Sequence, residues 1–163
     1  MSQRLIPNRP FPPYAFLPGV NPHPEKEGGH MFGIELECHP LTQDNFHEHS
    51  DYHYAFDLFN FGYYWESHVW WEELWHLAGR KGELADLLKG LIKLAAAGVK
   101  MKLGHEVPAK GHIERGIELF EKVRNHAHTV EFFGVELDRL LEELHSLKET
   151  PEKIRELQIE LIR

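Results

Sequence analysis

The sequence predicts an all-α protein, a single helical bundle of about five to six helices with an extended, proline-rich N-terminal arm. From residue 51 onward, apolar residues recur at helical spacing in segments separated by glycine or proline, with no convincing pair of strands. Before that point, seven of the first 24 residues are proline, which removes amide donors and fixes extended geometry. The 163 residues therefore divide into an arm with loops over 1–50 and a helical bundle domain over 51–163.

The arm is expected to be ordered and to pack on the body. It carries bulky apolar residues, among them Phe11, Tyr14 and Phe16, which a disordered spacer would rarely hold. Residues 31–50 have no clear period and are predicted to be loop with a short strand or turn.

Helices are predicted over about 52–59, 62–78, 83–103, 110–126 and 137–147, and a last one begins at Thr150. Thr150 is a good N-cap, Pro151 suits the first helical position, and an acid follows in the first turn. The last helix has an apolar face at Ile154, Leu157 and Leu161, through which a homodimer could form.

The most distinctive segment is FNFGYYWESHVWWEELW, residues 59–75. At about 100° per residue, its aromatic and leucine side chains cover more than half of the helix circumference. Such a helix is expected at the centre of the bundle, packed on the helix 83–103. The structural core is predicted to include Trp65, Trp71, Trp75, Asn60, Gly62, Tyr64 and Gly90.

His68 and Glu72 lie one turn apart inside this apolar arc and are expected to be partly desolvated. They could be a hydrogen-bonded core pair, ligands of a divalent metal or small polar ligand, or an acid–base pair. The core pair is favoured, because this spacing occurs on many helices by chance. Glu66, on the opposite side of the helix, is a further candidate, and the arm could bring His23 or His30 to the pair.

The composition excludes some classes of function. With 26 acidic and 18 basic residues, the net charge is −8, which argues against nucleic-acid binding. A membrane span is not expected, since lysines interrupt the most apolar helix. Cys38 is the only cysteine, so no intramolecular disulfide can form, and a cytoplasmic location is expected. Lys89, Lys93 and Lys100 favour a solvated face that pairs with nearby acids over an anion-binding cradle.

The aromatic segment together with LLKGLIKLAAAGVKMKLG, residues 87–104, resembles the signature of the family called domain of unknown function 309. The resemblance covers about residues 18–135 and implies an all-α bundle without assigning an activity. Val69 stands where the family usually has an acid, and Lys93 stands where it has glutamine. The matching positions are Phe59, Asn60, Gly62, Tyr64, Trp65, Glu66, His68, Trp71, Glu72, Trp75, Gly90, Leu91, Ile92, Ala95, Ala96 and Ala97.

Two functions remain open from the sequence. One is a binding protein for a small polar ligand or a divalent metal, with a site at His68 and Glu72. The other is a non-catalytic structural or protein-interaction module, in which the pair only stabilises the core. The sequence contains no glycine-rich phosphate loop, nucleophile elbow, HExxH or CxxC motif, and it does not decide whether the protein is an enzyme.

Overall fold

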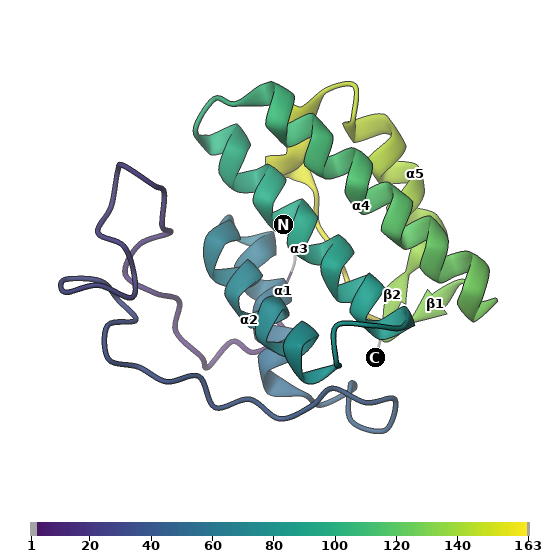
Figure 1. Cartoon of the computed structure of the whole chain (residues 1–163), viewed down its shortest axis with the longest axis horizontal. Coiled ribbons are helices and arrows are strands. Elements are labelled where there is room, and N and C mark those ends of the chain that lie inside the picture. The colour runs from purple at the N-terminus through teal and green to yellow at the C-terminus, as the bar shows by residue number, and fades with distance from the viewer. Residues whose placement is uncertain (1–2, 163) are drawn as a thin grey trace.

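The computed structural model describes residues 3–162, so the first two residues of the predicted arm and the last residue of the predicted bundle lie outside it. Figure 1 shows the helices side by side, with the arm looping over one flank. The prediction of an all-α bundle is confirmed. The helices are α1 (Ser50–Asn60), α2 (Tyr64–Leu77), α3 (Glu83–Lys102), α4 (Glu106–Ala127), α5 (Leu137–Leu147) and the 3₁₀ helix η1 (Pro151–Glu156).

The centre of the bundle is α3, not α2 as the sequence suggested. α3 packs against α2 on one side and α4 on the other, and it also contacts η1. Two glycines permit this close packing. A Cβ at Gly90 would lie 2.6 Å from the Phe120 ring of α4, and one at Gly98 would lie 2.4 Å from the Tyr64 ring of α2. Small residues on α3 therefore let neighbours approach from both sides.

The predicted core residues divide between the interior and the edge. Trp71 and Tyr64 are buried in the core, whereas Trp65 and Trp75 are half-buried. The apolar arc of α2 is wide because the arm, as well as the bundle, covers this helix. Phe16 of the arm packs edge-on against Trp65, with ring centroids 5.2 Å apart. The wide arc thus reflects a helix placed between two coverings.

The C-terminal segment differs from the prediction. The start at Thr150 is correct, but the segment forms a 3₁₀ helix of six residues and then extends. Asn60 fixes the extended part, because its Nδ2 donates to Ile159 O at 2.9 Å and its Oδ1 accepts from Ile159 N–H at 2.8 Å. Ile154 and Leu157 are buried within the chain. The apolar face suggested for a homodimer is therefore largely covered.

A short hairpin, which the sequence analysis did not predict, joins α4 to α5. Its strands are β1 (Glu131–Phe132) and β2 (Val135–Glu136), and they pair antiparallel. Val135 also forms a bridge to Leu161. The hairpin therefore anchors the C-terminal segment, a long-range pairing that local periodicity does not report.

The arm runs without helix or strand from residue 3 to residue 49, so the short strand considered for residues 31–50 is not formed. Its beginning is held by the buried Asp57 of α1. The carboxylate oxygens accept hydrogen bonds from the N–H of Leu5 at 2.7 Å and of Ile6 at 2.9 Å. Further along, Phe11 stacks on Tyr63 with ring centroids 4.8 Å apart. The arm is therefore attached by polar and aromatic contacts together.

None of the helices in residues 3–162 has the length and apolar character needed to cross a membrane.

Candidate functional site

The predicted pair on α2 forms, but on the surface. His68 Nε2 lies 3.1 Å from Glu72 Oε2, and the side chains are 30% and 46% exposed. His76, one turn further, places its Nε2 3.7 Å from the other Glu72 oxygen. The expected partial desolvation is met, and the Trp65 ring lies 5.8 Å from the imidazole of His68, but the pair does not lie in the core. The bundle covers the Trp71 side of α2 and leaves this side largely open.

The imidazole of His68 is already occupied at both nitrogens. Its Nδ1–H donates to Trp65 O at 2.9 Å, while its Nε2 faces Glu72. The pair is a histidine–carboxylate contact at a partly exposed surface, where such contacts contribute little to stability. Across the described residues, no three His, Cys, Asp or Glu side chains are grouped so that they could hold a metal ion.

Glu66 is much more deeply buried than Glu72. Its side chain is 2% exposed, and that of the arm residue His30 is 4% exposed. Glu66 Oε2 accepts two hydrogen bonds, from the N–H of Phe16 at 2.9 Å and from His30 Nε2–H at 2.8 Å. The arm therefore brings its histidine to Glu66, on the far side of α2 from the pair it was expected to join.

His23, the other arm candidate, does not join either group. Its ring packs against Trp65 with centroids 5.8 Å apart, and its Nδ1 accepts from the N–H of Glu25 at 3.2 Å. The five candidates thus separate into one buried pair, one surface pair and one histidine that packs on an indole.

The second oxygen of Glu66 is unusual. Within residues 3–162, Oε1 is buried and has no hydrogen-bond donor. Glu66 and His30 both line a cavity of about 470 Å³ between the arm and helices α1 and α2, which we call the arm cavity. Its other lining residues are Arg9, Pro10, Phe11, Pro12, Pro13, Met31, Ile34, Glu35, Leu36, Tyr54, Leu58 and Trp70.

Arg9, which sequence reasoning missed, is fixed at the wall of the arm cavity. Its guanidinium carbon lies 3.9 Å from the ring centroid of Tyr54 and 4.8 Å from that of Trp70. Arg9 also donates to Asp51 Oδ1 at 2.8 Å. Cation–π contacts and an ion pair hold the guanidinium in place. The one signal in the sequence was an arginine set between Pro7 and Pro10 in the arm.

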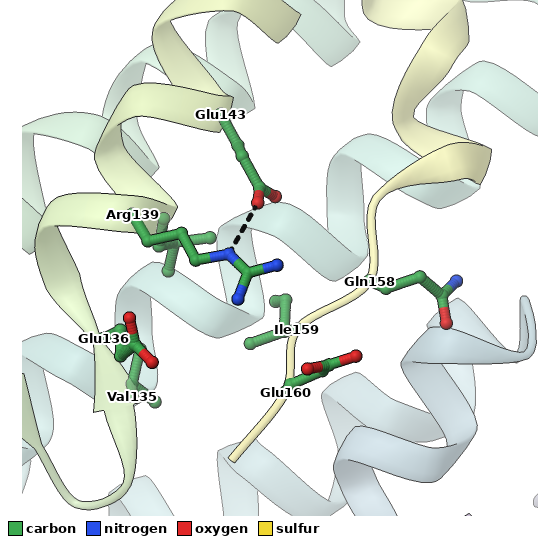
Figure 2. Close-up of a pocket in the computed structure, with 8 residues that line it drawn as sticks. Val135, Glu136, Arg139, Glu143, Gln158, Ile159 and Glu160 are labelled. Carbon is green, nitrogen blue, oxygen red and sulfur yellow. Dashed lines mark hydrogen bonds and ion pairs between the residues drawn. The ribbon is translucent and has the colours of Figure 1, made fainter. Parts of the chain in front are cut away.

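A second cavity, drawn in Figure 2, is too small to bind an organic ligand. It lies between α5, β2 and the extended C-terminal segment and encloses about 20 Å³, room for about one water molecule. Arg139 points to Glu143 across it, with Nε 3.3 Å from the carboxylate oxygen. The arm cavity, by contrast, combines the size of a small-molecule site with an unpaired polar atom.

Part of the arm cavity lies in a stretch of the chain that matches a known family. Residues 52–111 match the family described as Domain of unknown function (DUF309). The matched stretch is similar to this family and spans almost all of α1, all of α2 and α3, and the start of α4. It includes Tyr54, Glu66 and Trp70, whereas Arg9 and His30 lie outside it. The arm cavity is therefore bounded by the matched stretch on one side and by the arm on the other. A search of curated proteins found no match to the chain.

Proposed function

We propose that the protein binds a small organic molecule in the arm cavity, with Glu66 as the group that recognises it. The observation that carries the proposal is the unpaired Oε1 of Glu66. A buried polar group without a partner costs about 1–3 kcal/mol, and more when it is charged. A ligand that donates a hydrogen bond to this oxygen would remove that cost.

The walls define the class of ligand. Phe11, Met31, Ile34 and Leu58 supply apolar surface, while the Glu66 carboxylate supplies the acceptor. Charge-assisted hydrogen bonds are the stronger ones, so the carboxylate favours a cationic donor. We therefore expect a molecule with an apolar body and an amino group. The volume of the arm cavity, about 470 Å³, lies in the lower half of the range for small-molecule pockets, roughly 300–1,000 Å³.

An organic ligand is preferred to a divalent metal at this position. Glu66 and His30 together supply two side chains that could bind a metal, and Oε2 of Glu66 already accepts two hydrogen bonds. Stable metal sites in proteins use three or four protein ligands. The surface group His68, Glu72 and His76 supplies more donors, but it is open to solvent and already engaged in internal contacts.

The test uses benzylamine as the probe, because it joins an apolar ring to an ammonium group. We expect benzylamine to shift the indole N–H signal of Trp70 in an NMR titration, with a dissociation constant of about 1–10 mM, as befits a fragment. Glu66→Gln should weaken this binding about tenfold by removing the charge. The matched control is Glu35→Gln, since Glu35 also lines the cavity but is exposed; it should change the affinity less than about twofold.

The proposal fails if benzylamine leaves Trp70 unshifted in the wild-type protein at about 10 mM, or if both variants weaken binding equally. In the first case Glu66 and His30 only fasten the arm, which is the structural alternative. That role predicts a lower Tm for Glu66→Gln without any effect of the amine.

A further inference from the structure

The packing of α3 against α4 fixes which of their side chains lie opposite each other. Gly90 of α3 lies against Phe120, and Leu94 lies against Gly116. One turn forward on α3 thus corresponds to one turn back on α4, as in any antiparallel pair. The ion pair Lys122–Asp86, with Nζ 3.2 Å from Oδ2, lies within two residues of the same register.

This register gathers basic residues along the line where α3 and α4 meet. Lys89, Lys93 and Lys100 lie within about 40° of one another on α3, by the helical repeat. By this register Arg115 is level with Ala95, two residues from Lys93, and His112 falls between Lys93 and Lys100. We call these five residues the basic stripe. The two helices lie side by side, and the arm lies on the α1–α2 side of α3, away from α4.

The three lysines of the basic stripe have no carboxylate partner among the described residues. Among the described residues, Lys89, Lys93 and Lys100 form no salt bridge with a carboxylate, in contrast to Lys122, which pairs with Asp86 of α3. The expectation that these lysines pair with nearby acids is therefore wrong. Arg115 pairs only with Glu118 on its own exposed helix face.

Besides burial, the basic residues of the stripe lower the pKa values of their neighbours by charge repulsion. Burial, followed by the charges of Lys89 and Arg115, lowers the pKa of the Lys93 ammonium. Burial, followed by the charges of Lys93 and Lys100, lowers the pKa of His112. Like charges held together cost free energy that a bound anion would recover.

We propose that the basic stripe docks an acidic segment of a partner protein. From Lys89 to Lys100 the stripe covers about 16 Å of helix, the length of about five extended residues. A row of this length matches a chain of carboxylates better than a single phosphate. Trp75 adds an aromatic edge, because Lys89 Nζ lies 4.5 Å from the centroid of its ring.

The charge of the whole chain favours a short acidic segment over a nucleic acid. The net charge is −8, so a long polyanion that extended beyond the stripe would meet a predominantly acidic surface. A short segment can remain within the positive region. The proposal is independent of ligand binding in the arm cavity, which lies on other elements.

The test measures fluorescence anisotropy of a labelled hexaglutamate peptide at low ionic strength. We expect saturable binding that weakens between about 50 and about 200 mM salt. The double variant Lys93→Gln/Arg115→Gln should weaken binding about fivefold or more. The control Lys148→Gln/Lys153→Gln removes the same charge near the other end of the chain and should change affinity less than twofold, as a rough limit.

Four results would overturn the proposal. One is the absence of peptide binding, and another is equal loss in the two double variants. A third is tighter binding of a thymidine oligonucleotide of equal charge, which would favour nucleic acid. The fourth is concentration-dependent self-association that Lys93→Gln/Arg115→Gln abolishes, which would make the stripe a contact between two copies of this chain. The same variant should keep or raise the Tm, whereas a purely structural role for these cations predicts a lower Tm.

Discussion

Asp57 anchors the start of the N-terminal arm, and Asp57→Asn tests how strongly. The carboxylate is buried and accepts from the N–H of Leu5 at 2.7 Å and of Ile6 at 2.9 Å. Arg4 Nε lies 3.5 Å from Oδ2. Asparagine keeps the shape but has a single oxygen acceptor, so its NH₂ group would face one of the two N–H donors.

The expected cost follows from these contacts. One charge-assisted hydrogen bond, worth about 1.5–3 kcal/mol, is lost, and the other becomes a weaker neutral bond. A buried N–H is left without an acceptor, unless the first residues of the arm detach and let water reach it. Because detachment of the arm would limit the total loss of stability, we expect the free energy of unfolding to fall by about 2–4 kcal/mol.

Urea unfolding followed by circular dichroism measures the global change, and amide hydrogen exchange at Leu5 and Ile6 reports the local one. Both amides should lose protection in Asp57→Asn. Asp44→Asn is the control, because Asp44 is an exposed loop residue. A stability change under about 0.5 kcal/mol with Leu5 and Ile6 still protected would show that the Asp57 contacts do not hold the arm.

Further predictions concern packing and thiol chemistry. Gly90→Ala should destabilise the protein by about 1–3 kcal/mol in urea unfolding, because its Cβ would lie 2.6 Å from the Phe120 ring. Gly111→Ala, in α4 with open space around the new Cβ, should stabilise it by about 0.5–1 kcal/mol; the same sign for both would contradict the close approach of α3 and α4. Burial, aided by the charge of Asp51, raises the pKa of Cys38 to about 12. At pH 8 the thiolate fraction should therefore be about a thousandfold below that of an unperturbed thiol. Iodoacetamide should label Cys38 slowly until denaturant is added, and labelling at the rate of free cysteine would refute the shift.

The helices could be predicted because their signals are local. Apolar spacing and flanking glycines or prolines placed α2, α3 and α5 to within a few residues. Asn60 and Gly90 were identified as structural positions, although the partners that make them so, Ile159 and Phe120, could not be named. The prediction of a last α-helix was wrong, because the bridge between Val135 and Leu161 competes with helix continuation after η1.

The candidate site was only half predictable. Helical geometry alone correctly placed His68 beside Glu72 and Glu66 on another side of α2, since these relations depend on angle within one helix. Burial depends on what covers each side, and that information was absent. Glu66 was placed on the opposite side of the helix from His68, but nothing in the sequence showed that the arm covers it and supplies His30 and the N–H of Phe16.

The sequence by itself determined that the chain is helical, where most helices lie, and which residues share a face of each. Those properties follow from backbone geometry and the period of the side chains. Only the tertiary structure decided that α3 is central, that the arm and α2 enclose Glu66, and that α3 and α4 align their cations. Such arrangements arise from contacts between residues tens of positions apart, whose free energy depends on burial and neighbouring charge rather than on local order.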